Sequence, residues 1–221
     1  MASTRLTKEM ISEAKKLLES MGLPWVQAPE EGEAQAAAMC SNGEVYASAS
    51  QDFDSLLFGA PLLVRNLTLS GRRKVPRKDE YVDVFPEMIE LAKTLSGLGI
   101  SREQLIWIGI LVGTDFNKGV KGIGPKKAIK LVKECTSLDE VVTKSAGEFE
   151  VEPKDLESFF LHPKSVLDYP VEFRQPDPEA VVKFLVDEHD FSKERVQGAA
   201  KAFAGKMSET LQQSKLGEWF G

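Results

Sequence analysis

Segments with helix and strand character alternate over the first 85 residues of this 221-residue chain, and the alternation then stops. Helical periodicity over 7–21 and 33–40 is followed by short apolar runs at 45–49, 62–67 and 81–85, which predict strands. After Pro86 the pattern predicts helices alone, over 105–112, 126–134, 137–140, 153–160, 177–189 and 192–204. A buried strand at 45–49 between helices is typical of a parallel sheet. We therefore expect an α/β domain followed by an all-α region.

Local signals predict where three of these helices begin. Thr7 has the side chain of a helix N-cap, and Ser101 and Gln104 have the spacing of a capping box. Pro125 suits the first position of the helix over 126–134, where its missing N–H has no cost.

Composition excludes several classes of protein. No apolar run approaches the ~18 residues of a transmembrane helix, and the N-terminus lacks the apolar core of a signal peptide. Two cysteines, Cys40 and Cys135, cannot form a disulfide framework, and no cysteine–histidine cluster suits zinc. We therefore expect a reduced, cytoplasmic protein that does not associate with a membrane.

The net charge of −6 argues mildly against nucleic acid, but the basic residues are clustered. One cluster contains Arg72, Arg73, Lys74, Arg77 and Lys78; a second contains Lys118, Lys121, Lys126, Lys127, Lys130 and Lys133. A charged run is usually a solvated face, so either cluster alone is weak evidence for phosphate binding.

Five acids follow or precede apolar segments: Glu31, Glu33, Asp52, Asp54 and Asp115. Each alone has a plain interpretation, either as a helix-start preference or as a turn residue. Together they form a set of hard oxygen ligands that suits Mg²⁺ or Mn²⁺. No nucleophile or histidine base accompanies them, so the chemistry they favour is phosphodiester hydrolysis by metal-activated water.

A glycine-rich loop links two of the predicted helices. Its glycines permit a tight hairpin whose amides approach phosphate, and the next helix offers its N-terminus to the same anion. The candidate contacts are Gly119, Lys121, Gly122, Gly124, Lys126 and Lys127, with Arg72 and Arg73 of the other cluster. A simple glycine-rich turn is the alternative, and no strand precedes the loop as a dinucleotide-binding motif requires.

The segments VQAPEEGEAQAA, YASASQDFDSLLFGAPLLVRNLT, ILVGTDF and VKGIGPKKA resemble the flap endonuclease branch of the XPG-type structure-specific nucleases, most closely the archaeal enzymes. The resemblance implies a PIN-like α/β nuclease core over 1–100, a helix-hairpin-helix region over 101–205 and a flexible tail over 206–221. It implies that Glu31, Glu33, Asp52, Asp54 and Asp115 are catalytic ligands of two Mg²⁺ ions, for which Mn²⁺ can substitute. It also implies that the hairpin grips duplex DNA and holds a monovalent cation such as K⁺.

The chain departs from this family at its beginning. Family members carry a preceding region with the leading strand, two further metal-binding aspartates and a helical arch, and these 221 residues hold no equivalent. We therefore expect either a fragment or one half of a split enzyme. A sheet that lacks its leading strand exposes an edge, so we expect the isolated chain to be marginally soluble or to need a second polypeptide docked there.

The last residues resemble the sliding-clamp-binding motif that ends most flap endonucleases. The spacing of Gln213, Leu216, Trp219 and Phe220 predicts an apolar plug for a pocket on the clamp PCNA. The alternative is that the two aromatic side chains fold back onto the chain's own helices.

These features favour a structure-specific 5′ flap endonuclease with 5′–3′ exonuclease activity, acting on flap or branched duplex DNA in replication and repair. A non-catalytic DNA- and clamp-binding module is the alternative. A D-x-D phosphatase acting on small molecules is a third reading, but it explains none of the hairpin.

Overall fold

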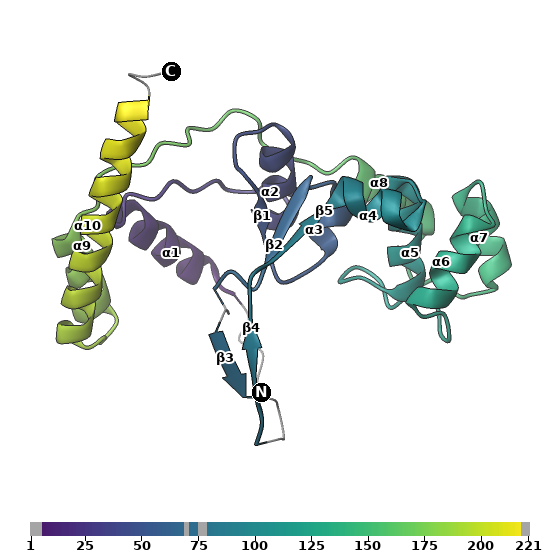
Figure 1. Ribbon diagram of the computed structural model, residues 1–221, viewed down its shortest axis with the longest axis horizontal. Helices are drawn as coiled ribbons and strands as arrows, with labels where there is room; N and C mark the ends of the chain where they lie inside the picture. The colour runs from purple at the N-terminus through teal and green to yellow at the C-terminus, as the bar shows by residue number, and fades with distance from the viewer. Residues whose placement is uncertain (1–5, 69–70, 75–78, 218–221) are drawn as a thin grey trace. The chain divides into compact units, whose positions relative to one another are not determined.

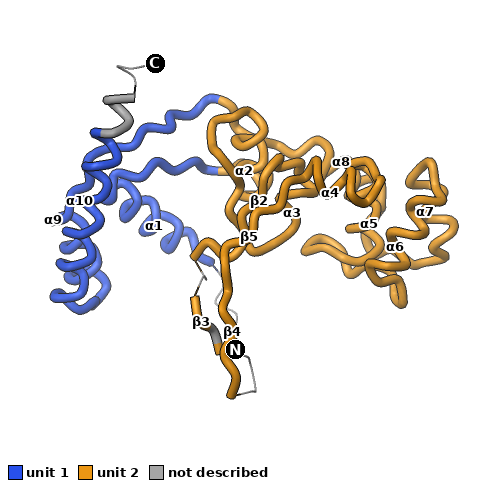
Figure 2. The backbone as a smooth tube through the Cα atoms, viewed as in Figure 1, with its two compact units in different colours: residues 1–27, 168–221 blue, residues 28–167 orange. Residues whose placement is uncertain are grey.

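The computed structural model describes residues 6–68, 71–74 and 79–217, and it divides the chain into two compact units (Figure 2). One unit spans residues 28–167; the other combines residues 1–27 with 168–221. These boundaries differ from those expected at 100/101 and 205/206. The reason is that one apolar core joins Ala34 and Leu57 to Ile106 and Phe160, so residues on both sides of position 100 share it.

The unit over 28–167 contains a three-stranded sheet (Figure 1). Its strands are β1 (Ser48–Ala49), β2 (Leu62–Arg65) and β5 (Glu87–Glu90), in the order β1-β2-β5. The expected parallel pairing is confirmed for β1 and β2, although β1 is shorter than the run at 45–49. The expectation that strands cease after Pro86 is wrong, because β5 pairs antiparallel with β2. Since Ile89 alone in β5 is not exposed, this strand has no apolar run to reveal it.

A separate two-stranded antiparallel sheet joins β3 (Gly71–Lys74) to β4 (Tyr81–Val84). The strand expected at 81–85 is confirmed, but it pairs with the basic segment, which we did not expect to be a strand. The Arg72 guanidinium lies 4.9 Å from the centre of the Tyr81 ring, and Lys74 forms a 2.7 Å ion pair with Asp79.

Seven helices of this unit lie in the part of the chain that the structure describes. They are α2 (Gly32–Ser41), α3 (Asp54–Leu57), α4 (Leu91–Leu98), α5 (Arg102–Val112), α6 (Pro125–Lys133), α7 (Leu138–Ser145) and α8 (Pro153–Leu161). The Ser101 capping box and the first-position Pro125 are confirmed. Helix α5 is central, because it packs against α3, α6, α7 and α8 and fully buries Ile106, Ile110 and Leu111.

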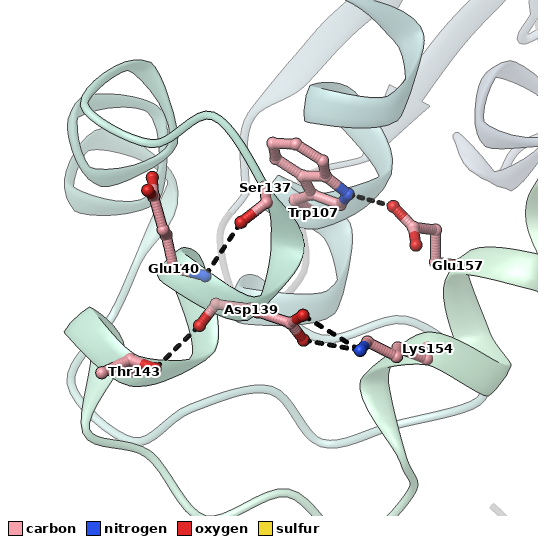
Figure 3. A network of polar contacts seen from close by, with 7 residues as sticks. All are labelled: Trp107, Ser137, Asp139, Glu140, Thr143, Lys154 and Glu157. Atoms are coloured by element: carbon pink, nitrogen blue, oxygen red, sulfur yellow. Dashed lines mark hydrogen bonds and ion pairs between the residues drawn. The ribbon is translucent and has the colours of Figure 1, made fainter.

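Polar contacts tie the helices around α5 together (Figure 3). The Trp107 indole donates to Glu157 of α8, and Lys154 of α8 pairs with Asp139 of α7 at 2.8 Å. Arg102 donates to the Leu57 carbonyl at 3.0 Å and to the Phe160 carbonyl at 2.7 Å, which joins α5 to α3 and α8. The end of α3 is thereby fixed against the helical part of the unit.

The second unit is helical in its described residues, with α1 (Lys8–Ser20), α9 (Pro178–Val182), the π-helix η1 (Lys183–Glu188) and α10 (Lys193–Gly217). The Thr7 hydroxyl accepts a hydrogen bond from the Met10 amide, as expected of an N-cap. Val181, Val196 and Ala200 form its core. The helix expected over 177–189 is present, but its second half is π-helical.

Helix α10 continues to Gly217 where we expected a flexible tail from residue 206. The segment 206–216 contains neither proline nor glycine, so its polar composition does not interrupt the helix. Trp219 and Phe220 lie outside the described residues.

Among the described helices none is long and apolar enough to cross a membrane by itself, although α4 and α5 reach that length and composition as a pair bent by 81°.

Candidate metal centre and nucleic-acid interface

Four of the five candidate acids stand at the ends of elements that share the central core. Glu33 lies in the first turn of α2, and Asp54 is the first residue of α3. Asp52 lies in the loop after β1, and Asp115 follows the Gly113 that ends α5. Because α3 packs against both α2 and α5, these ends are brought to one region of the unit.

The pKa of Asp54 reports the crowding of these acids. This pKa is raised from its ordinary 3.8 to about 6, mainly by burial and further by repulsion from Glu33, Asp115 and Asp52. A hydrogen bond from the Asp115 backbone amide partly offsets it. Glu33, Asp52 and Asp115 therefore each lie within electrostatic reach of Asp54.

Serine side chains bridge these acids. The Ser50 hydroxyl donates to Glu33 and accepts from the Asp52 amide at 3.1 Å, while Ser48 and Ser55 bond to each other at 3.2 Å in the core. Burial raises the pKa of Glu33, and hydrogen bonds from Ser50 and Ser55 oppose that rise. Sequence analysis missed the role of these serines, although the Ala-Ser alternation before Gln51 places Ser48 and Ser50 on one strand face.

Glu31 has a different environment from the other four acids. It occupies the N-cap position of α2, where its side chain makes no capping hydrogen bond. It lines a cavity of about 510 Å³ together with Glu30, Phe116, Val151, Asp155, Leu156 and Phe159. The structure therefore gives Glu31 an aromatic and acidic neighbourhood of its own.

The carboxylate side chains are of the chemical type that binds a hard divalent cation. Crowded carboxylate oxygens are the donors that Mg²⁺ and Mn²⁺ prefer, and a cation would relieve the repulsion that raises the pKa of Asp54. Among the described residues, however, no three acidic, histidine or cysteine side chains converge closely enough to hold an ion. The acids thus supply part of a ligand set.

The glycine-rich loop forms a compact hairpin between α5 and α6. Gly119 has a φ of +70°, and a Cβ there would meet the Val112 carbonyl carbon at 2.4 Å, so the hairpin lies directly against the end of α5. The Val120 amide donates to the Leu111 carbonyl at 2.8 Å, which fixes this approach. Gly122 also needs a positive φ, of +85°, but lies in open space.

The hairpin presents its candidate lysines to solvent. Lys121, Lys126 and Lys127 are exposed, and the Lys127 ammonium donates to the Gly122 carbonyl at 2.9 Å. A cavity of about 700 Å³ separates Asn117–Lys121 from the loop that follows α7, and a 2.7 Å ion pair between Lys118 and Glu150 spans it.

The remaining candidates lie elsewhere. Arg72 and Arg73 are on β3, where Arg72 is exposed. Gln213 and Leu216 belong to α10 by their backbone, and Trp219 and Phe220 lie beyond the described residues.

Residues 22–115 match the family model of the XPG I-region. Flap endonuclease 1 of Staphylothermus marinus is 52% identical over 224 residues, a match that covers all of this chain and 64% of that protein. This chain is a homologue of the archaeal flap endonucleases. It spans less than two thirds of the length of that relative.

Solved structures agree with this relationship. Flap endonuclease-1 from Methanococcus jannaschii matches with a TM-score of 0.78 and 40% identity, over 93% of this chain and 60% of that one. Human GEN1, solved in complex with Holliday junction DNA, matches with a TM-score of 0.69 and 23% identity, over 93% and 54% of the two chains, which shows a shared fold. The chain therefore has the mixed α/β fold of these nucleases, consistent with a PIN-like core and a helical region.

The raised pKa of Asp54 predicts how its replacement changes stability. Because this pKa is about 6 in the folded chain against 3.8 ordinarily, the folded state holds the proton more tightly than the unfolded state. That stabilisation is complete below the ordinary pKa and is lost as the pH rises through about 6. In metal-free buffer we expect Asp54→Asn to raise the melting temperature by about 2–4 °C near pH 7.5 and to leave it unchanged near pH 4.

Thermal unfolding followed by circular dichroism at the two pH values tests this prediction, with the exposed Asp187→Asn as control. A shift of equal size at both pH values would show that charge repulsion at Asp54 is not its cause.

Proposed function

We propose that this chain carries part of the metal centre and the DNA-gripping surface of a structure-specific 5′ flap endonuclease with 5′–3′ exonuclease activity. The observation that carries the proposal is that α2, β1, α3 and α5 pack so that Glu33, Asp52 and Asp115, at or beside their ends, lie near Asp54. The flap endonuclease names of relatives at about 52% identity support the same activity.

Each acid has a proposed role in this centre. Asp52, Asp54 and Glu33 bind two Mg²⁺ ions, for which Mn²⁺ can substitute. Asp115 and Glu31 bind these ions through water molecules or orient those water molecules. Ser50 keeps Glu33 facing the Asp52 loop through its two hydrogen bonds. When bound, the ions would activate water and neutralise charge on the phosphate.

The ligand set requires carboxylates in addition to those described. We propose that they come from a segment outside these 221 residues, on the same or on a second polypeptide. Among the described strands β1 pairs with β2 alone, so its other edge is available to a further strand beside Asp52.

A non-catalytic DNA- and clamp-binding module is the second candidate. The failure of three described acids to converge on an ion favours it for the chain by itself. Cleavage of a labelled flap substrate in Mn²⁺, with the chain alone and with an added N-terminal nuclease region of a relative, separates the two functions.

Asp54→Ala tests the catalytic proposal in that assembled enzyme. We expect cleavage to fall below detection while affinity for flap DNA in Ca²⁺ changes by no more than a few-fold, because the acid binds metal and not DNA. Asp187→Asn is the control. Retained turnover in Asp54→Ala would remove this acid from the metal centre.

The hairpin is proposed to bind the phosphate backbone of duplex DNA through Lys121, Lys126, Lys127 and the N-terminus of α6, with Arg72 and Arg73 as further contacts. A K⁺ ion at the hairpin would compete with Lys127 for the Gly122 carbonyl. Because the proposed contacts are with the phosphate backbone, this binding does not depend on the base sequence of the DNA.

Replacing Lys121 and Lys126 by alanine should weaken binding to every duplex sequence and reduce the slope of log affinity against log salt by about 0.9 per lysine. Fluorescence anisotropy between low and moderate salt measures that slope. Lys93→Ala, an exposed lysine of α4 that pairs with Glu90, is the matched control. A changed base preference at an unchanged slope would contradict a phosphate contact.

The C-terminal residues are proposed to bind the sliding clamp PCNA, with Gln213, Leu216, Trp219 and Phe220 as the contacts. We expect Trp219→Ala with Phe220→Ala to abolish micromolar binding to the clamp in isothermal titration calorimetry, while cleavage without the clamp is unchanged. Glu209→Gln, outside the motif, should bind as wild type does. Undiminished clamp affinity in the double variant would exclude these aromatic residues from the contact.

A further inference from the structure

The loop that carries Asp52 leaves the sheet directly after β1. The Ser50 amide still donates to the Val64 carbonyl of β2 at 3.2 Å, but Gln51, Asp52 and Phe53 are exposed. In the absence of a cation, repulsion between Asp54 and the neighbouring carboxylates favours conformations of this loop in which these groups lie farther apart. Specific side-chain contacts, and not burial, must therefore hold this loop in place.

Arg65, the last residue of β2, contacts the loop on both sides of Asp52. Its Nε donates to the Gln51 carbonyl at 3.0 Å, and its guanidinium carbon lies 4.2 Å from the centre of the Phe53 ring. The Arg65 side chain is only 23% exposed, so most of its surface is covered. One side chain thus fixes the residues that precede and follow the acid.

Arg65 also contacts Glu87, its cross-strand partner on β5. The Glu87 carboxylate accepts from Nη1 of Arg65 at 3.4 Å and is itself 57% exposed. An ion pair this exposed adds little stability. The contacts to the loop require the planar fork of arginine, which hydrogen-bonds at its edge and stacks on an aromatic face at the same time.

We propose that Arg65 is a positioning residue that holds residues 51–54 so that Asp52 and Asp54 are arranged for a divalent cation before it binds. The proposal rests on the proposed function, because it assumes that these acids bind metal. It assigns Arg65 no contact with the ion or with DNA. Side chains that orient metal ligands typically contribute about 10–100-fold to metal affinity.

The test compares wild type, Arg65→Met, Arg65→Lys and Glu87→Gln, each assembled with the N-terminal nuclease region of a relative that completes the proposed ligand set. Mn²⁺ binding is measured by electron paramagnetic resonance, and hydrogen exchange of the peptide over 50–57 is measured without metal. We expect both Arg65 variants to bind Mn²⁺ about tenfold more weakly and to exchange faster over 50–57. Glu87→Gln should match wild type in both measurements, because it leaves the loop contacts intact.

Melting temperatures keep the comparison interpretable. If Arg65→Met fails to fold, then Arg65→Lys and Phe53→Leu, which removes the stacking surface, carry the test. Unchanged Mn²⁺ affinity and exchange in the folded Arg65 variants would overturn the positioning role. An equal loss in Glu87→Gln would also overturn it, because the ion pair would then be the cause.

Failure of the proposed function gives a different experimental result from failure of the Arg65 role. If the wild-type assembly shows no Mn²⁺ binding, the proposed metal centre is wrong, and this proposal falls with it. If wild type binds and the Arg65 variants bind equally well, Arg65 alone loses its role.

Discussion

The burial of Asp54 among Glu33, Asp52 and Asp115 is an unfavourable feature that the rest of the larger unit has to offset. Carboxylates brought this close oppose folding unless the elements that carry them are held by other contacts. Those contacts are apolar: α5 buries Ile106, Ile110 and Leu111, and α2 and α3 pack into the same core. Arg102 adds hydrogen bonds that fix the end of α3. The core therefore stabilises an acidic centre that is unfavourable by itself, as sites arranged for a cation commonly are.

Local signals predicted most of the helices and three of the five described strands, but they did not predict α3, α4, β3 or β5. Thr7, Ser101 and Pro125 each act within one turn, so the helix starts they predict are found in the structure. β5 is formed by pairing with β2, more than twenty residues earlier, and its residues are mostly exposed. β3 is likewise formed by pairing and lies in a run that composition marks only as basic. Sequence pattern reveals burial more readily than it reveals pairing.

The same distinction applies to the candidate site. The acids were predictable because each adjoins an apolar element that can be recognised in the sequence. Ser50 and Arg65 were missed because their contacts depend on the register of β1, β2 and β5 and on the path of the loop between β1 and α3. The fifth acid, Glu31, shares the pattern of the others but is the N-cap residue of α2 and lines a cavity with Phe116 and Phe159. Pattern alone could not separate those two positions.

The end of α5 couples the acidic centre to the hairpin. Asp115 lies between Gly113, where the helix ends, and Gly119, whose Cα is packed against the Val112 carbonyl. Between them the Asn117 side chain donates to the Ile110 carbonyl at 2.7 Å, and the Thr114 and Asn117 backbones bond to each other. These contacts tie the turn that carries Asp115 to the end of α5 and to the start of the hairpin. If the hairpin binds a phosphate backbone as proposed above, this turn would link the position of that backbone to the position of Asp115.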